Sequence, residues 1–285
     1  ITGATSGLGE AAAHALSSLG ARVVVVGRNQ KKVETTVAAL GESARGEIAD
    51  LSLMSDTREV AGRLLDSETQ IDVLINNAGV MWNPKTMTKD GFESQFGINH
   101  LGHFALTGLL LPQLEATRGS RIVTVSSTGH RLGNGDLFWD DINADLGYHP
   151  RKRYYASKLA NLLFTYELDR RLRGKESATI AVAVHPGAAD TELVRYVSGA
   201  FGMIMRLALP LVRPFMNTAA QGAWPTELAA TAPGVEGGQY FGPGGMGEIS
   251  GPARQVDSSD ASKDPGKAKQ LWDLSIEMTG VDPGL

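Results

Sequence analysis

Short runs of β-branched residues alternate along the chain with stretches of helical periodicity, and this alternation strongly limits the possible folds. Four runs rich in Val and Ile show no polar alternation, which is typical of strands buried on both faces: 22–26, 71–75, 121–125 and 179–184. Helical patterns separate and follow these runs, at 8–19, 30–40, 55–65, 92–114, 155–172 and 268–278. Alternation of this kind predicts an α/β fold, a doubly wound parallel sheet with helices on both faces. No linker or repeat divides the chain, so residues 1–285 are expected to form a single domain.

Three stretches depart from this alternation. Residues 129–153 are a polar insertion that we expect to be loop with a short helix. A glycine-rich stretch opens with Gly242-Pro-Gly-Gly-Met-Gly247 and runs to about Lys263, and here we expect a mobile loop. Residues 193–216 are dense in apolar side chains, interrupted by three arginines.

The composition excludes several classes of protein. Hydrophobic residues make up 42% and charged residues 20% of the chain, as in soluble globular proteins, and a net charge of −4 argues against nucleic acid as a partner. The absence of cysteine excludes disulfides and thiolate chemistry. No apolar run approaches the roughly 18 residues of a membrane span. We therefore expect a cytoplasmic protein, although a targeting or anchor segment upstream of Ile1 would not be visible. His100 and His103 lack the partners of a metal site.

Glycines at positions 3, 7 and 9 lie where a strand would end and the first helix would begin. Glycine lets the backbone approach a pyrophosphate, which then lies on the unpaired N–H groups of the helix N-terminus. A tight turn without a ligand explains the same glycines equally well, because a lone glycine pattern is a weak signal. Since the chain opens inside this motif, the first strand of the sheet is expected to be truncated.

Arg28 lies 19 residues beyond Gly9, close to the offset at which dinucleotide-binding folds carry the residue that reads the ribose. An acidic residue there selects NAD, whereas arginine suits the 2′-phosphate of NADP. Arg28 therefore favours NADP(H), with a surface arginine in a turn as the alternative. Asp50 is suited equally to accepting a hydrogen bond from an adenine amino group and to ending a turn or capping a helix. Asn-Asn-Ala-Gly at 76–79 allows close approach of a cofactor and can also tie neighbouring strands together.

Tyr154 and Lys158 are four residues apart in a predicted helix, so their side chains share one face. Asn161 and Thr165 continue the same polar stripe. Pairs of this kind are also common on solvated helix surfaces. The pair alone therefore does not decide between a surface feature and a proton donor with the cation that tunes it.

Taken together, the motifs resemble the short-chain dehydrogenase/reductase family, classical type. They occur in the family's order and approximate spacing: Thr-Gly-x-x-x-Gly-x-Gly at 2–9, Asn-Asn-Ala-Gly at 76–79, Ser127, Tyr154-x-x-x-Lys158 and Pro186-Gly187. The interval of 27 residues from Ser127 to Tyr154 contains Trp139-Asp-Asp-Ile-Asn143 and resembles the retinol-dehydrogenase-like branch. The resemblance implies a Rossmann fold and hydride transfer between a nicotinamide and an alcohol or carbonyl.

The resemblance assigns catalytic roles to Asn99, Ser127, Tyr154 and Lys158. Tyr154 is expected to be the general acid/base, because the ammonium of Lys158 favours the phenolate and lowers a pKa that is about 10 in a free phenol. Ser127 is expected to hydrogen-bond the substrate oxygen. Asn99 is expected to position a water beside the lysine, with an asparagine bonded to helix backbone as the alternative. The residues expected to contact the cofactor are Gly3, Thr5, Ser6, Gly7, Leu8, Gly9, Arg28, Asp50, Leu51, Asn77, Ala78, Gly79, Tyr154, Lys158, Pro186, Gly187 and Thr191.

These implications predict an NADP(H)-dependent oxidoreductase acting on a small-molecule carbonyl or alcohol. The family carries a substrate lid where residues 193–216 lie, which favours a lipophilic substrate. A core helix, a subunit contact or interfacial membrane binding would explain the same apolar side chains. The competing class is a non-catalytic NADP(H)-binding sensor on the same fold, against which the intact set of four catalytic residues argues. A homodimer and a homotetramer are both compatible with the sequence.

Overall fold

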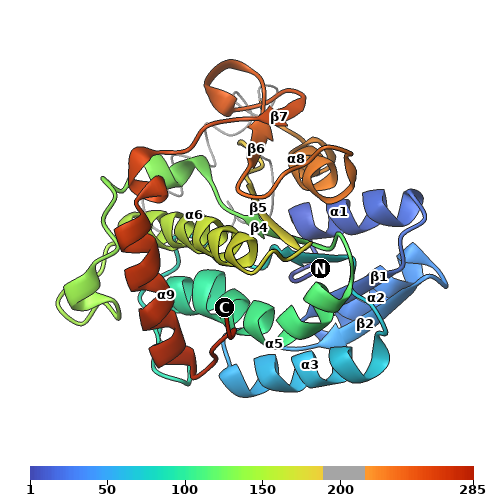
Figure 1. The fold of residues 1–285 in the computed structure, drawn as a ribbon, viewed down its shortest axis with the longest axis horizontal. Coiled ribbons are helices and arrows are strands. Elements are labelled where there is room, and N and C mark those ends of the chain that lie inside the picture. Colours follow the sequence, from blue (N-terminus) through green and yellow to red (C-terminus); the bar gives the residue numbers. More distant parts are fainter. Residues whose placement is uncertain (189–215) are drawn as a thin grey trace.

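The computed structural model describes residues 1–188 and 216–285 and places a sheet between two layers of helices (Figure 1). The strands of the described residues are β1 (Val23–Gly27), β2 (Ala44–Ile48), β3 (Val73–Asn76), β4 (Arg121–Val125), β5 (Ile180–Val184), β6 (Tyr240–Pro243) and β7 (Ala253–Gln255). Two parallel strands, β1 and β2, form one part of the sheet, and β3-β4-β5-β6-β7 form the other, in which only β7 is antiparallel.

Thr2 joins the two parts of the sheet. It bridges Val26 of β1 in parallel, and its N–H donates to the carbonyl of Ile75 in β3 at 3.0 Å. The order of strands across the sheet is therefore β2-β1-Thr2-β3-β4-β5-β6-β7. From Thr2, successive strands are first added on one side, as β1 and β2, and then on the other side, from β3 onward. The doubly wound parallel sheet predicted from the sequence is confirmed, and ligands of such sheets bind at the carboxyl ends of the strands beside this change of side.

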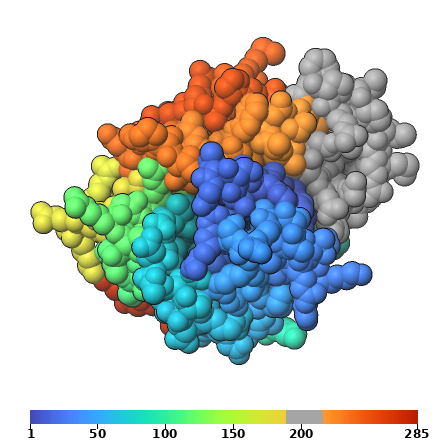
Figure 2. Space-filling view, turned by 90° about the vertical axis from the view of Figure 1, so that its right-hand side faces the viewer, coloured from blue at the N-terminus to red at the C-terminus, as the bar shows by residue number. Residues whose placement is uncertain are grey.

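Strands β1, β3, β4 and β5 send alternate side chains into two apolar layers. One layer lies beneath α1 (Gly7–Ser18), α2 (Gln30–Leu40) and α8 (Ala219–Thr231). The other lies beneath α3 (Met54–Ser67), α5 (Gly102–Ala116) and α6 (Pro150–Gly174). Adjacent residues divide between the layers, as Ile122 and Val123 of β4 do. Helix α8 packs against α1, and Figure 2 shows the orange segment directly above the blue one.

The helix predicted over 92–114 contains an interruption. It begins as α4 (Ser94–Phe96), widens into a π turn, η1 (Gly97–Leu101), and continues as α5. A π turn holds one extra residue and frequently lies at a functional site. Asn99 lies in the middle of this turn.

Strand β2 has no counterpart in the predicted elements because its sequence, Ala-Arg-Gly-Glu-Ile, carries no apolar run. Its charges are compensated within the fold: Arg45 donates to Glu47 and Glu68, and Arg63 donates to Glu47 at 2.7 Å. Among the described strands, β2 pairs only with β1, so it lies at the edge of its part of the sheet. A strand in this position is less covered by helices and does not require apolar side chains on both faces. Helix α8, rich in small residues, is likewise absent from the predicted elements.

The glycine-rich stretch expected to be a mobile loop contains regular structure, so that expectation is wrong for much of its length. It includes the end of β6, then η6 (Met246–Glu248), β7 and η7 (Asp260–Lys263). Backbone hydrogen bonds close residues 244–252 into a hairpin: Gly244 donates to Pro252 at 2.7 Å and Gly245 to Ser250 at 2.9 Å. In Figure 1 this hairpin lies at the top, beyond the ends of β6 and β7.

The insertion at 129–153 is loop with short helices, as predicted. Its helical turns are η2 (Thr128–Arg131) and η3 (Trp139–Asp141), and α6 begins at Pro150. Arg153 is 5% exposed and secures the insertion, since its guanidinium donates to the backbone and carboxylate of Asp141.

The last helix, α9 (Pro265–Thr279), packs against α6 and crosses it in Figure 1. Trp272 is buried between Phe104 of α5, with ring centres 5.2 Å apart, and Phe164 of α6, at 6.1 Å. Arg58 of α3 donates to the carbonyls of Thr279 and Gly280, at 2.8 and 3.1 Å. The C-terminal helix thus completes the core formed by α3, α5 and α6.

Over the two described ranges, none of the helices has the length and apolar character needed to cross a membrane. The same residues contain no cluster of three or more His, Asp or Glu side chains arranged to hold a metal ion.

Candidate active site

Tyr154, Lys158, Ser127 and Asn99 come from three elements and meet at the carboxyl end of β4. Ser127 follows that strand, and the Lys158 ammonium donates to the carbonyl of Val125, its last residue, at 3.0 Å. Lys158 Nζ lies 5.9 Å from the centre of the Tyr154 ring. Asn99 Oδ1 and Lys158 Nζ both approach Gly79: a Cβ added there would lie 3.2 and 3.7 Å from them. The structure therefore brings all four predicted catalytic residues together.

The side chain of Asn99 is fully buried and bonded to its surroundings. Its Oδ1 accepts from the N–H of Val80 at 2.8 Å, and its Nδ2 donates to the carbonyl of Val80 at 3.0 Å and to Ser157 Oγ at 2.9 Å. Ser157 in turn donates to the carbonyl of Tyr154 at 2.8 Å. Asn99 is thus bonded to the backbone of Val80, outside its own helix, and it ties the segment after β3 to the helix that carries Tyr154. Its expected role of positioning a water beside Lys158 stays a prediction.

Burial dominates the protonation of the two helix residues. It raises the pKa of Tyr154 to about 12, while a hydrogen bond with Ser127 acts in the lowering direction. Burial lowers the pKa of Lys158 to about 8. In the protein alone the phenol is therefore protonated at neutral pH. The lowering of the Tyr154 pKa that the resemblance leads us to expect from Lys158 is not the larger effect.

The glycine turn is packed too tightly for side chains. A Cβ on Gly3, whose φ is 65°, would lie 2.8 Å from Ala78 Cα, and one on Gly9 would lie 2.5 Å from the carbonyl oxygen of Gly3. Ser6, the residue before α1, makes no capping bond with its side chain. A bare turn leading into an uncapped helix of 12 residues fits the pyrophosphate of a dinucleotide.

Asn77 and Thr2 hold together the two loops that are expected to contact the cofactor. Asn77 Nδ2 donates to the carbonyl of Thr2 at 2.8 Å, and Thr2 Oγ1 accepts from the N–H groups of Asn77 and Ala78, at 2.9 and 3.0 Å. Tying of neighbouring strands by these amides is confirmed. Leu8 lies with Gly7 and Gly9 in the first turn of α1.

The residues expected around the adenosine end lie past the ends of β1 and β2. Arg28 is exposed directly after β1, and the methyl group of Thr5 lies against Gly27, 2.9 Å from where a Cβ would stand. Asp50 accepts from the N–H of Ser52 at 2.9 Å, so it forms a turn, and the neighbouring Leu51 is buried. This hydrogen bond agrees with the turn interpretation of Asp50, and its contact with an adenine amino group stays a prediction.

Pro186 and Gly187 follow β5, on the same edge of the sheet as Ser127. Gly187 has a φ of 70° and packs against the backbone of Ile249, so it lies in a tight loop. Thr191 lies outside the described residues. So does the predicted lid at 193–216, apart from Met216.

Two further residues at the site carry no recognisable motif. His103, two residues beyond the π turn, donates from Nδ1 to the carbonyl of Asn99 at 3.0 Å, and its Nε2 lies 2.9 Å from Thr2 Oγ1. Trp82 has a left-handed backbone, with φ 55°, and its ring stands edge-on to Tyr154 at 6.4 Å. The only signal for Trp82 in the sequence is its place three residues after Asn-Asn-Ala-Gly.

Comparison with known proteins agrees with this geometry. The family model for short chain dehydrogenases matches residues 1–137. Human retinol dehydrogenase 14 is 38% identical over 99% of this chain and 85% of its own length, and human polyprenol dehydrogenase is 35% identical over 99% and 84%. The crystal structure of an uncharacterized protein from Mycobacterium paratuberculosis superposes with a TM-score of 0.81 and 38% identity, over 100% of this chain and 94% of that one. The 3-ketoacyl-(acyl-carrier-protein) reductase of Brucella melitensis, complexed with NADH, shares the fold at a TM-score of 0.65 and 24% identity, over 84% and 93%.

The chain belongs to the short-chain dehydrogenase/reductase family and is similar to its retinol dehydrogenases. It is therefore an oxidoreductase that acts on a CH–OH or C=O group with a nicotinamide cofactor.

Proposed function

We propose that the protein is an NADP(H)-dependent oxidoreductase that interconverts a lipophilic carbonyl compound and its alcohol, with Tyr154 as general acid/base. The convergence of Tyr154, Ser127 and Lys158 at the end of β4 carries this proposal. A bound nicotinamide supplies or accepts the hydride. In the reducing direction Tyr154 gives its phenolic proton to the carbonyl oxygen, and in the oxidising direction it takes the proton of the alcohol.

The protonation state of Tyr154 in the protein alone is the one that the reducing direction needs. Because burial raises the pKa of Tyr154 to about 12, the phenol carries its proton at neutral pH and is ready to donate it. Ser127, in hydrogen-bonding contact with the phenol, is placed to donate to the same substrate oxygen. Oxidation requires the phenolate, which the buried ammonium of Lys158 favours by its charge.

Two observations support the finer parts of the proposal. Arg28 is exposed directly after β1, so the position that reads the ribose carries a cation instead of the acidic residue that selects NAD. The relatives named for retinol and polyprenol take their names from apolar alcohols, which supports a lipophilic substrate.

The decisive experiment combines a substrate panel with Tyr154→Phe. The unmutated protein is expected to reduce aldehydes or ketones with NADPH, and loss of the phenolic proton is expected to lower turnover about 10²- to 10⁴-fold. NADPH binding, followed by fluorescence, is expected to persist. Retention of most of the turnover by Tyr154→Phe would show that the proton comes from elsewhere.

Tyr155→Phe is the matched control. Tyr155 is the neighbouring ring, packed against Gly129, and no hydrogen bond of its hydroxyl is seen among the described residues. Its loss of a hydroxyl is expected to leave turnover nearly unchanged.

Chain length tests the lipophilic substrate separately. Each methylene buried on binding contributes about 0.8 kcal/mol, or roughly fourfold in affinity per carbon. We expect affinity to rise along a series of linear aldehydes until the pocket is full. A flat series would remove the case for a lipophilic substrate and leave the reaction type intact.

A further inference from the structure

The turn of the glycine-rich hairpin at 244–252 contains an unfavourable backbone conformation. Glu248 has a φ of 56°, in the left-handed region that side chains other than glycine rarely adopt. Gly247 before it, with φ 63°, shares the conformation at little cost. Conformations of this kind persist only where surrounding contacts hold them, so the contacts of Glu248 are informative.

The carboxylate of Glu248 contacts residues from two loops of the site. Arg131 donates to both of its oxygens, at 2.9 and 3.1 Å. His185 Nε2 lies 3.0 Å from Oε2 of the same carboxylate. Arg131 ends the helical turn η2 that begins directly after Ser127, and His185 directly precedes Pro186. One carboxylate thus bridges the turn after Ser127, which is expected to hydrogen-bond the substrate, and the loop of Pro186 and Gly187, which are expected to contact the cofactor.

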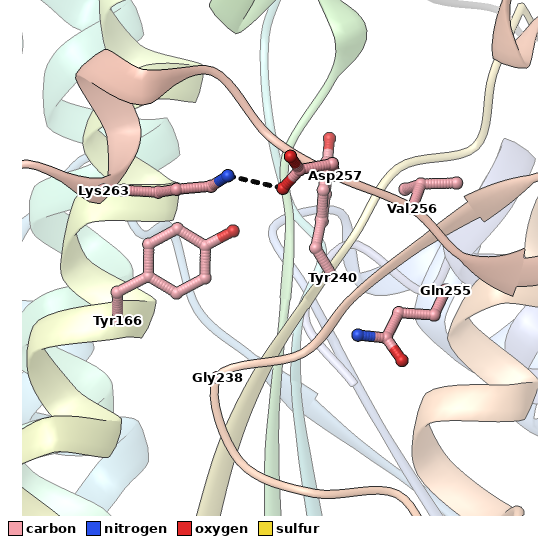
Figure 3. Close-up of a pocket in the computed structure, with 7 residues that line it drawn as sticks. All are labelled: Tyr166, Gly238, Tyr240, Gln255, Val256, Asp257 and Lys263. Carbon is pink, nitrogen blue, oxygen red and sulfur yellow. Dashed lines mark ion pairs between the residues drawn. The ribbon is translucent and has the colours of Figure 1, made fainter.

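The serine side of this bridge is fixed independently. His130 Nδ1 donates to the carbonyl of Ser127 at 2.6 Å, while its Nε2 accepts from the N–H of Ser259 at 3.1 Å. Arg131 also donates to the carbonyl of Asp257. Residues 255–257 line a hollow of about 260 Å³ together with Tyr166 of α6 and Tyr240 of β6 (Figure 3). The segment that contains Asp257 therefore lies close to both of these elements.

The other side of the bridge is equally defined. The N–H of Gly187 donates to His185 Nδ1 at 3.2 Å, so the hydrogen of the neutral ring is on Nε2. Nε2 lies 3.0 Å from the carboxylate of Glu248, but the two groups are not aligned for a hydrogen bond, so the contact is electrostatic. Burial lowers the pKa of His185 to about 4, although the charge of Glu248 opposes this. Burial acts to raise the pKa of Glu248, but Arg131 and then His185 outweigh it and bring it below its ordinary value. A neutral imidazole therefore faces a charged carboxylate at neutral pH.

Three glycines make the arrangement possible. A Cβ on Gly242 would lie 1.9 Å from His185 Nε2, and one on Gly245 would lie 2.2 Å from the carbonyl oxygen of Ser250. A Cβ on Gly187 would lie 2.3 Å from the carbonyl oxygen of Ile249. The glycine-rich sequence is thus what allows the hairpin to bring Glu248 against His185.

We propose that Glu248 is a positioning residue, which fixes the turn bearing Ser127 relative to the Pro186–Gly187 loop. This inference rests on the proposed function, because both loops acquire their roles from it. The strained backbone of Glu248 is the cost of presenting its carboxylate to both loops at once. Met246 at the tip of the hairpin is 92% exposed, so this side chain does not pack into the core. The contribution of the hairpin to the site is instead the contacts of Glu248 with Arg131 and His185.

The test uses Glu248→Gly, which relieves the backbone and removes the carboxylate in one change. Glu176→Gly is the matched control, because Glu176 also has a left-handed backbone, with φ 54°, and lies exposed beyond the end of α6. Both variants are expected to melt at or above the temperature of the unmutated protein. Only Glu248→Gly is expected to lose kcat/KM, by about 10- to 100-fold, as misplacement of reacting groups does. Glu248→Gln keeps one acceptor for Arg131 and is expected to recover part of this loss.

A double substitution tests the route of the effect. Arg131→Met alone is expected to lower kcat/KM, and combining it with Glu248→Gly is expected to add little, because both remove the same link. Fully additive losses would overturn the proposal, as would a Glu248→Gly variant with unchanged kcat/KM or one whose loss follows a lowered melting temperature. NADPH affinity, measured by fluorescence, is expected to fall for Glu248→Gly, for Arg131→Met and for the double variant, and to stay unchanged for Glu176→Gly. If the unmutated protein binds NADPH but turns over no carbonyl or alcohol, the proposed function fails, whereas failure of the positioning role leaves unmutated activity intact.

Discussion

Lys158 is only 5% exposed, so the contributions of its ammonium to activity and to stability are expected to oppose each other. Burial lowers its pKa from 10.5 to about 8. Between pH 8 and 10.5 the unfolded chain therefore binds more protons than the folded protein, and stability rises with pH. Below pH 8 the full cost of burying the charge is present.

Lys158→Met is accordingly expected to abolish turnover and to stabilise the fold at pH 7, by up to about 3 kcal/mol. The carbonyl of Val125 keeps a partner in this variant, because Asn161 Nδ2 also donates to it at 3.1 Å. Urea unfolding at pH 7 and pH 10 measures the effect, and the gain should shrink at the higher pH. A variant less stable at both pH values would mean that the ammonium contributes favourably.

Arg28→Asp tests the preference for NADP(H). A charge-assisted bond to a phosphate contributes about 1.5–3 kcal/mol, so NADPH affinity is expected to fall roughly 10- to 150-fold. NADH carries no 2′-phosphate and is expected to lose far less. Titration of both cofactors into both proteins measures this. Equal affinities of the unmutated protein for the two cofactors would contradict the role of Arg28.

The sequence predicted the residues whose spacing is itself the signal. Tyr154 and Lys158 are one helical turn apart, and the glycines at 3, 7 and 9 form a local turn, so both could be recognised without the fold. Glu248 and His185 could not, because their contact spans 63 residues and neither lies in a recognised motif. The same holds for His103 and Thr2, which are 101 residues apart.

At the scale of elements, the buried strands β1, β3, β4 and β5 were predicted because strands covered on both faces must be apolar throughout. Strand β6 is also buried but was not predicted, because its sequence, Tyr-Phe-Gly-Pro, contains no run of β-branched residues. Strand β2 was not predicted because it contains the charged residues Arg45 and Glu47 and no apolar run. These two side chains form a hydrogen-bonded ion pair at the edge of their part of the sheet. The π turn at Gly97–Leu101 leaves the helical pattern around it almost unchanged, so periodicity showed the helix and not its interruption. Features defined by backbone hydrogen bonds alone, such as the hairpin at 244–252, leave little trace in a hydrophobic pattern.

Helix α9 offers the clearest test of packing. Trp272→Ala is expected to cost about 3–5 kcal/mol, because it opens a cavity between Phe104 and Phe164. Trp272→Phe is the control: it keeps the apolar ring and removes an indole N–H that has no partner among the described residues. Chemical denaturation is expected to separate the two clearly. Similar, small losses in both would show that α9 contributes little to the core.

For the whole molecule, four buried histidines predict sensitivity to acid. Burial lowers the pKa of His100 to about 3 and the pKa values of His103, His130 and His185 to about 4. Each is 6.5 in the unfolded chain, so between pH 6.5 and 4 the unfolded chain binds up to four more protons at these positions. The free energy of unfolding should then decrease as the pH is lowered, by at most about 5 kcal/mol per pH unit. Urea denaturation from pH 7 to pH 5 measures this slope, and a slope below about one proton would contradict it.

The contacts of α9 with residues much earlier in the chain also govern how the protein is made. On the ribosome, α3 and α5 emerge long before Trp272 and Thr279, which cover Phe104 and accept from Arg58. Domains generally fold as units during synthesis, and surfaces left uncovered meanwhile are prone to aggregate. The nascent chain must therefore carry an apolar face of α5 through most of its translation. We expect it to engage chaperones until its last helix is released.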